Sequence, residues 1–275
     1  MALRFEDVSE QILHVGNGAE PQDLDPHLVT GVPEHRITTT LFEGLVDLDS
    51  DTLEPIPAVA QSWEVSENGK VYTFHLRRTA RWSNGDPVTA HDFVYAWRRI
   101  LTPELGSEYA YMLHCIQNAR EYNEGKITDF GLVGAKALDD YTLRVVLVNP
   151  TPYFLSMQIH YTWFPVYRAT IERYGQMAER GTRWTRAGNL VGNGAFQLER
   201  WEPDRLIVVS KNPYYWNEDS VKLDAIRFYP IDNVMTEELL FRVGRLHLAE
   251  SIPVNKVEVY ERGRPEVLRK DPYLG

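Results

Sequence analysis

The spacing of apolar positions along the chain predicts short strands and helices in mixed order. The first apolar run, residues 11–16, predicts a strand that leads into a loop. Pro33 is placed as the first residue of a helix that Gly44 stops, because proline fits the first helical turn and glycine commonly follows the last. Residues 65–77 alternate around an Asn-Gly turn, which predicts a β-hairpin.

The stretch RWSNGDPVTAHDFVYAWRRILTPE (81–104) places a serine, a histidine and an aspartate close together and raises the question of a catalytic triad. Thr89 precedes an apolar stripe with helical spacing, and Asp92 stands three residues later, an arrangement that resembles a capping box. His91 and Asp92 are adjacent, so on a helix their side chains diverge by about 100° and cannot form a relay. With Ser83, they are interpreted as part of a scaffold.

The remaining elements follow the same mixed order. Residues 106–125 predict one helix that ends near Gly125, and residues 136–147 predict a turn at Asp139-Asp140 and a buried strand. Strands and helices are mixed without a regular βαβ alternation, which predicts an α/β fold of mixed α+β character. The other predicted elements are a helix at 169–174, a second hairpin with its bend at 202–204, a strand at 222–231, and a helix to Gly244 followed by a short strand.

Composition narrows the function classes. The 275 residues are enough for one large domain or two smaller ones. Aromatic residues make up 12%, which is compatible with a contact surface or a large core. The net charge of −10 and the lack of a basic run exclude a nucleic-acid partner. The charged start of the chain has no apolar signal-peptide region, so we expect a cytosolic protein or one whose leader was removed.

Motifs that carry chemistry are missing from the sequence. Cys115 is the single cysteine, so no intramolecular disulfide can form, and its apolar helical pattern predicts a buried thiol. The eight histidines lack metal-binding spacing, and no nucleophile elbow, P-loop or dinucleotide motif is present. VGNGAF (191–196) predicts a turn, and DLDPH (23–27) predicts local backbone capping. Paired carboxylates for glycoside hydrolysis remain open.

The order of motifs resembles extracellular solute-binding protein family 5, the oligopeptide and dipeptide receptors of ABC importers. The resemblance extends from about Leu13 to the last residue, and the oligopeptide-binding branch is the most similar. Its most specific string is F-x-L-R-x-x-x-x-W-S-x-G-x-P-V-T-A-x-D-F, at 74–93. The other matching segments are GNGAEPQDLDPH (16–27), LFEGLV (41–46), VGNGAFQLERWEPDRLIVVSKNPYYW (191–216) and DPYLG (271–275).

The resemblance implies a periplasmic-binding-protein-like type II fold, in which two lobes joined at a hinge close over an extended peptide. Residues 1–42 and 167–275 would form a discontinuous, incomplete lobe I, and residues 43–166 a smaller inserted α+β domain, lobe II. The peptide backbone would pair with the receptor backbone like an added strand, while its side chains sit in hydrated pockets. The resemblance implies no catalytic group, no metal and no cofactor.

The resemblance also implies ligand-binding residues. They are Thr30, Gly31 and Val32, where the backbone around Val32 would hydrogen-bond the peptide, and Tyr109, an aromatic that would face the cleft. Thr30 stands where the most similar branch has a glutamate, so a charge contact there is lost. Tyr109 could equally be a residue that starts a helix and packs on a neighbour. His247 replaces the acid of a G-x-hydrophobic-D string, which changes the local electrostatics.

Family members are roughly twice as long as this chain. The resemblance therefore implies that a further large lobe, distinct from lobe I and lobe II, is absent. That lobe carries the aspartate that pairs with the peptide α-amino group. We therefore expect a fragment, from partial expression or a truncated reading frame, that supplies at most half of a site and binds weakly by itself.

The implied partners are an oligopeptide ligand and the permease subunits of an ABC transporter. The implied location is periplasmic or on the cell surface, with membrane contact only through the transporter or a removed lipid anchor. One alternative is a receptor of the same fold for nickel, haem, an opine or an oligosaccharide. Another is a peptide or glycan hydrolase that uses cleft carboxylates, and a third is a non-transport sensor.

Overall fold

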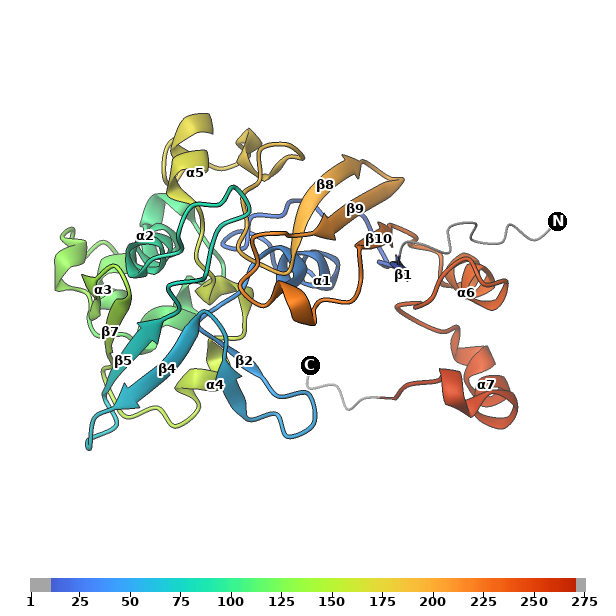
Figure 1. The fold of residues 1–275 in the computed structure, drawn as a ribbon, viewed down its shortest axis with the longest axis horizontal. Coiled ribbons are helices and arrows are strands. Elements are labelled where there is room, and N and C mark those ends of the chain that lie inside the picture. The colour runs from blue at the N-terminus through green and yellow to red at the C-terminus, as the bar shows by residue number, and fades with distance from the viewer. Residues whose placement is uncertain (1–10, 271–275) are drawn as a thin grey trace.

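The computed structural model describes residues 11–270 of the chain (Figure 1). The N-terminal residues on which the leader expectation rests in part, and the DPYLG motif at 271–275, lie outside the described residues. The strands are β1 (Ile12–Gly16), β2 (Val46–Leu48), β3 (Pro55–Pro57), β4 (Ala60–Val65), β5 (Val71–Leu76), β6 (Ala135–Asp139), β7 (Thr142–Val146), β8 (Phe196–Glu202), β9 (Leu206–Lys211) and β10 (Ala225–Tyr229). The helices are α1 (Val32–Leu41), α2 (Ala90–Leu101), α3 (Ala119–Asn123), α4 (Phe154–Met157), α5 (Arg168–Tyr174), α6 (Val234–Arg242) and α7 (Val257–Gly263).

The first sheet joins the N-terminal strand to strands from late in the chain. Its order is β1-β10-β9-β8, with β1 parallel to β10 and the other neighbours antiparallel. The predicted second hairpin is confirmed as β8 and β9, and Asp204 takes the left-handed conformation at its bend (φ 57°). We call residues 11–42 and 196–229, which carry α1 and this sheet, the first-sheet unit.

The second sheet is antiparallel and has the order β4-β5-β7-β6. The predicted hairpin is confirmed as β4 and β5, with Gly69 at a positive φ of 66° in the turn. Along β5, Tyr72, Phe74 and Leu76 are buried while their neighbours are partly exposed, because successive side chains of a strand point to opposite faces. We call residues 60–146, which carry this sheet and α2, the second-sheet unit.

Helix α2 begins at the predicted cap. The Thr89 backbone N–H donates to Asp92 Oδ2 at 2.7 Å, and the Thr89 hydroxyl donates to the same oxygen at 2.9 Å. These bonds satisfy groups that a helix start leaves without intrahelical partners. The hydrogen bonds confirm the capping interpretation. The predicted stripe of Phe93, Trp97 and Ile100 is also confirmed, because all three side chains are fully buried.

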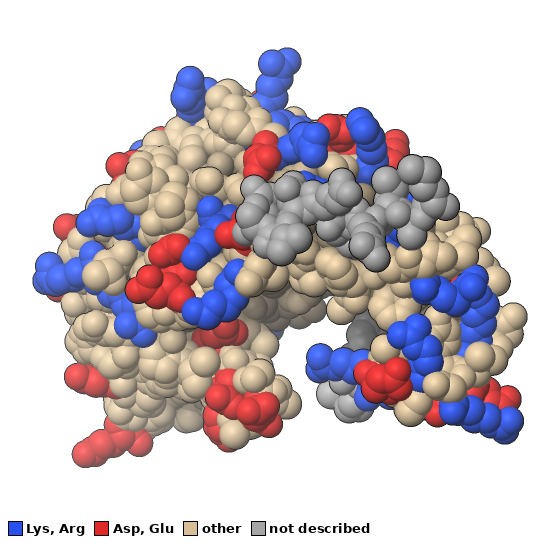
Figure 2. Space-filling view, turned by 45° about the vertical axis from the view of Figure 1, so that its right-hand side comes forward, with Lys and Arg blue, Asp and Glu red and all other residues tan. Residues whose placement is uncertain are grey.

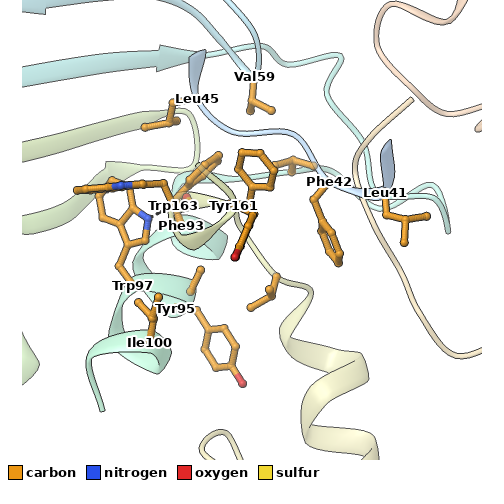
Figure 3. Close-up of a cluster of buried hydrophobic side chains, with 14 of the residues drawn as sticks. Leu41, Phe42, Leu45, Val59, Phe93, Tyr95, Trp97, Ile100, Tyr161 and Trp163 are labelled. Carbon is orange, nitrogen blue, oxygen red and sulfur yellow. Dashed lines mark hydrogen bonds between the residues drawn. The ribbon is translucent and has the colours of Figure 1, made fainter. Parts of the chain in front are cut away.

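The hydrophobic core runs without interruption through both units. Its aromatic centre is drawn in Figure 3, where Trp97 and Trp163 lie edge to face with ring centroids 5.5 Å apart. The Trp97 indole N–H donates to the Trp163 carbonyl at 3.0 Å, so the polar end of the ring is satisfied inside the core. This packing joins α2 to the short 3-10 helix η4 (Tyr161–Trp163).

The prediction of one helix over residues 106–125 is wrong. The chain forms a 3-10 helix, η2 (Ala110–Cys115), and then the short α3, with a break between them. At the break Gln117 N–H donates to Val146 O at 2.9 Å, and Gln117 O accepts from Gly134 N–H at 2.8 Å. Pairing with the second sheet therefore replaces the helical hydrogen bonds that the apolar spacing predicted.

Two other predicted boundaries also differ from the structure. Helix α1 ends at Leu41, before Gly44, because Phe42 is already extended. The strand predicted after α6 is reduced to a single bridge between Leu248 and Val15. The predicted division at residues 42 and 167 stays a prediction, although the two sheets draw their strands from its two parts.

Helices α6 and α7 project from the rest of the molecule, and we call residues 234–263 the C-terminal arm (Figure 1). Met235 and Leu239 on α6 and Val243 at its C-cap follow one another at helical spacing, and each is between 44% and 58% exposed. Figure 2 shows a deep hollow between this end of the molecule and the larger body. The arm therefore leaves an apolar face open to solvent.

Candidate functional site

The loop in front of α1 presents backbone groups to solvent. Gly31 is the N-cap residue of α1, and Pro33 is the second helical residue, so the helix begins one residue before the predicted start. Val32 is 47% exposed and Thr30 is also exposed. Within residues 11–270, the N–H groups of Thr30, Gly31 and Val32 donate to no protein acceptor. A helix start leaves such donors available for a ligand, since they have no intrahelical acceptor.

Tyr109 reaches this loop from the second-sheet unit. It lies just before η2, and its hydroxyl donates to the Thr30 carbonyl at 3.4 Å, a long and weak bond. The structure therefore brings together all four residues that the resemblance proposed, Thr30, Gly31, Val32 and Tyr109. Their role in binding a ligand stays a prediction.

A cluster of four rings adjoins the loop, and we call Tyr109, His35, His160 and Tyr161 the ring cluster. The Tyr109 and His160 rings meet edge to face at 5.3 Å, and His35 stacks on His160 at 6.3 Å. The Tyr161 ring lies 4.1 Å from that of His160, and its hydroxyl donates to the Val29 carbonyl at 3.0 Å. Residues from three distant parts of the chain thus form one aromatic wall.

The imidazoles of this wall are neutral at physiological pH. Burial, followed by the neighbouring His35, lowers the pKa of His160 to about 4. The pKa of His35 is also lowered, by burial and by Arg36. Burial raises the pKa of the Tyr161 hydroxyl, with smaller contributions from Tyr109 and Glu34. The wall therefore offers aromatic surface and hydrogen-bonding groups rather than charge.

A cavity of about 290 Å³ opens beside the loop. Buried Glu34 lines it and accepts a hydrogen bond from the Gln22 N–H at 2.7 Å. Arg180 lines the opposite part and donates to the Leu105 and Gly106 carbonyls at 3.3 Å. The cavity is therefore polar, and both signs of charge face it. The full lining is Gln22, Asp23, Leu28, Val29, Thr30, Gly31, Glu34, Glu108, Arg180 and Gly181.

A second cavity, of about 440 Å³, lies between α1 and the C-terminal arm. Arg36 of α1 forms an ion pair with Glu250 there, and Glu238 and Tyr260 line the opposite part. His247, which replaces the acid of the family string, also lines it and accepts a hydrogen bond from the His14 N–H at 3.0 Å. The His247 imidazole thus accepts a hydrogen bond from the main chain of β1 beside the cavity.

A buried ion pair lies behind the candidate site. Asp25 is 2% exposed and Arg99 is fully buried, and the guanidinium donates to both carboxylate oxygens, at 2.9 and 2.5 Å. Burial would raise the pKa of Asp25, but the charge and hydrogen bonds of Arg99 lower it. His27 accepts from Arg99 at 3.0 Å. The predicted local capping by DLDPH is confirmed, because Asp25 accepts the His27 N–H at 3.0 Å.

Each candidate catalytic residue has a structural partner outside the suggested triad. His91 faces Asp140 at 3.4 Å, Asp92 is engaged in the helix cap, and the Ser83 N–H donates to the Gly192 carbonyl. Burial raises the pKa of the Cys115 thiol to about 11. Among the described residues, no group of three or more His, Cys, Asp or Glu side chains could hold a metal ion. None of the described helices has the length and apolarity that a bilayer crossing needs.

Sequence reasoning missed the partners of Tyr109 in the ring cluster and the partner of Asp25. The sequence interpretation places His160 and His35 in the scaffold and gives Arg99 no role. A signal is present for Arg99, because it follows Tyr95 and Ala96 at spacings of four and three, and a charged residue on such an apolar face requires a buried partner. No comparable signal marked the ring cluster, since its members are far apart in sequence.

Comparison with known proteins gives one consistent set of relatives. The family model "Bacterial extracellular solute-binding proteins, family 5 Middle" matches residues 54–275. The periplasmic oligopeptide-binding protein OppA of Escherichia coli is 41% identical over 270 residues, which cover 96% of this chain and 48% of that protein. The chain thus spans about half the length of the curated relatives it matches.

Solved structures give the same picture. The unliganded open form of the murein tripeptide-binding protein MppA superposes with a TM-score of 0.87 at 34% identity. The match covers 94% of this chain and 48% of that one. Haemophilus influenzae OppA in complex with the peptide RPPGFSPFR superposes with a TM-score of 0.86 at 38% identity, and the match covers 92% of this chain and 48% of that one.

Proposed function

Because the chain belongs to family 5 of the bacterial extracellular solute-binding proteins, we propose that it captures oligopeptides in extended conformation for an ABC importer. In this proposal it acts outside the cytoplasmic membrane, in the periplasm or at the cell surface, and the permease subunits are its protein partners. The relatives are named as binding proteins, and one was solved with a peptide bound, so we propose capture without a chemical step.

The observation that carries the proposal is the meeting of Tyr109 with the loop at Thr30–Val32. Unpaired backbone N–H groups on an exposed loop can hydrogen-bond a peptide backbone as an added strand would. Such contacts use groups that every peptide shares, and the adjoining polar cavity has room for hydrated side chains. The site is therefore suited to peptides of varied sequence.

We propose that residues 1–42 and 167–275 form one lobe and residues 43–166 a smaller domain, so that the loop and Tyr109 lie on different parts. The separation of the strands into two sheets supports this division. The matched region covers about half of each relative, so these residues would supply one wall of the binding site. A site open on one side leaves much of the ligand in water and binds weakly.

Calorimetric titration of the chain with tri- to pentapeptides tests the proposal. We expect weak binding, with dissociation constants of about 1 mM, that changes little with side-chain identity. Peptides with the same side chains but N-methylated backbones should bind more weakly, because they keep the carbonyls that the loop N–H groups can bond but cannot donate in strand-like pairing. Tyr109→Ala should weaken binding further.

Two results would contradict the proposal. One is equal heat from the N-methylated and unmodified peptides, which would exclude strand-like pairing in which the peptide N–H groups donate. The other is cleaved peptide in the calorimeter cell, detected by mass spectrometry, which would indicate a hydrolase. Micromolar or tighter binding would contradict the single-wall argument while leaving peptide capture intact.

A further inference from the structure

Glu43 lies where the chain leaves the first-sheet unit, between the end of α1 and the start of β2. One of its carboxylate oxygens accepts a hydrogen bond from the Tyr215 hydroxyl, and the other accepts from the Trp216 indole N–H at 2.7 Å. Both donors belong to the segment that follows β9 of the first sheet. The carboxylate therefore links this segment to the stretch of chain that leaves the first-sheet unit, which we call the crossing chain.

The main chain of Glu43 is held from a second direction. Its N–H donates to the Asn193 side-chain oxygen at 3.0 Å, and its carbonyl accepts from the Asn193 amide at 2.9 Å. Gly194 N–H donates to the Leu41 carbonyl at 2.9 Å. A Cβ at Gly194 would lie 2.6 Å from the Thr40 carbonyl oxygen, so only glycine permits this approach. The predicted VGNGAF turn is thus a close contact with the crossing chain.

Trp216 extends the connection into the second-sheet unit. The Arg77 guanidinium carbon lies 3.8 Å from the centre of its ring, a cation–π contact. The Arg77 Nε–H donates to the Ala58 carbonyl at 2.7 Å. A continuous series of contacts therefore runs from the segment after β9 through Glu43 and Trp216 to the start of β4.

The electrostatic surroundings of Glu43 come from three elements. Asp47 of β2, Arg77 after β5 and Tyr215 after β9 face it, and the cavity of about 280 Å³ beside it has no other charged lining residue. Burial raises the pKa of Glu43 to about 7, while the bonds from Tyr215 and Trp216 act in the opposite direction. The net increase in pKa means that burial outweighs these bonds, so this folded arrangement holds the proton of Glu43 more tightly than a solvated carboxyl does, and protonation favours it.

We propose that Glu43 is a positioning residue that fixes the angle between the two units and so keeps Tyr109 beside the loop at Thr30–Val32. Its relevance to ligand capture rests on the proposed function, but the positioning itself does not. The neutral carboxyl is the form that this buried site favours, and ionisation loosens the segment after β9 because it places a desolvated charge there. The two units therefore have one well-defined arrangement below neutral pH and a wider range of arrangements above it.

Pulsed electron–electron double resonance measures the distance between two nitroxide labels and tests this proposal without any ligand. The labels are attached at Leu138→Cys on β6 and Glu199→Cys on β8, both exposed positions, in a Cys115→Ser background. We expect a narrow distance distribution at pH 5.5 and a broader one at pH 8.5. Glu43→Gln, which cannot ionise, should give the same distribution at both values, and Glu43→Ala a broad one at both.

Glu54→Gln is the matched control, because it removes an exposed carboxylate from the nearby β2–β3 connection, and it should behave like the unsubstituted protein. The proposal is overturned if Glu43→Gln keeps the pH-dependent broadening, or if Glu43→Ala stays as narrow as the unsubstituted protein at pH 5.5. Circular dichroism checks folding at each pH, and if Glu43→Ala does not fold, the Glu43→Gln comparison decides. Absence of peptide binding with these distance results intact would count against the proposed function alone.

Discussion

Replacing Arg99 with methionine is expected to lower the free energy of unfolding by about 3–5 kcal/mol. Arg99 is fully buried and donates to both oxygens of Asp25, and its Nε–H donates to the Met177 carbonyl at 2.8 Å. Methionine fills a similar volume but leaves the Asp25 carboxylate buried without its compensating charge. Urea unfolding, followed by circular dichroism at pH 7, measures the change as a shift of the midpoint at constant slope.

Two further variants show whether the loss comes from the unpaired charge. Arg205→Met removes an exposed ion pair with Glu202 and should change stability by less than about 1 kcal/mol. Asp25→Asn combined with Arg99→Met should be less destabilised than Arg99→Met alone, because no uncompensated charge remains. A loss below 1 kcal/mol in Arg99→Met, or no recovery in the double variant, would contradict the interpretation of this pair.

Stability is expected to fall as the pH drops from about 6.5 towards 3, and His27 should account for one proton of this dependence. His27 is buried, and burial, then the Arg99 charge, lowers its pKa from 6.5 to about 3. Arg99 can only donate, so His27 Nδ1 must be the acceptor and its Nε2–H faces the Phe164 carbonyl at 3.3 Å. Protonation in the folded state would direct a second N–H at the guanidinium.

The sign follows from the lowered pKa of His27 in the folded state. Above pH 6.5 both states hold a neutral imidazole, so its full contribution to stability is present. Below that value the unfolded chain binds a proton that the folded chain excludes, and stability falls by about 1.4 kcal/mol per pH unit for each such histidine. Burial also lowers the pKa of His14 and of His160 to about 4, which steepens the dependence between pH 6.5 and 4.

His27→Gln should remove one proton from the slope of unfolding free energy against pH. Glutamine keeps an acceptor for Arg99 and a donor for the Phe164 carbonyl, but it does not titrate. His91→Gln is the control for loss of an exposed imidazole, since its ring is 63% exposed. An unchanged slope in His27→Gln would show that His27 is already charged in the folded state.

Local elements of the fold could be predicted because their signals lie within a few residues. The Asn-Gly turn specified the β4–β5 hairpin, and the Thr89–Asp92 pair specified the start of α2. The helix predicted over 106–125 failed for a tertiary reason. Hydrogen bonds from Gln117 to a strand about 30 residues away outweighed the local preference of an apolar pattern.

The candidate site was predicted only in part. The resemblance indicated Thr30–Val32 and Tyr109. Thr30 and Tyr109 lie 79 positions apart in the sequence, so no periodicity could bring them together. The same limit applies to Asp25 and Arg99, separated by 74 positions. Such pairs depend on how the sheets and the segments that connect them are arranged in space. Short stretches of a single sequence do not specify that arrangement. Residue types alone could not show that His160 stands against Tyr109.

We propose that an extended peptide lies against the wall formed by the Thr30–Val32 loop and Tyr109. Amide chemical-shift mapping of the isotope-labelled chain, titrated with trialanine and with trilysine, tests this placement. We expect both peptides to shift the amides of Thr30, Gly31, Val32 and Tyr109 most strongly. Shifts that cluster elsewhere for both peptides, with these four amides unchanged, would contradict it.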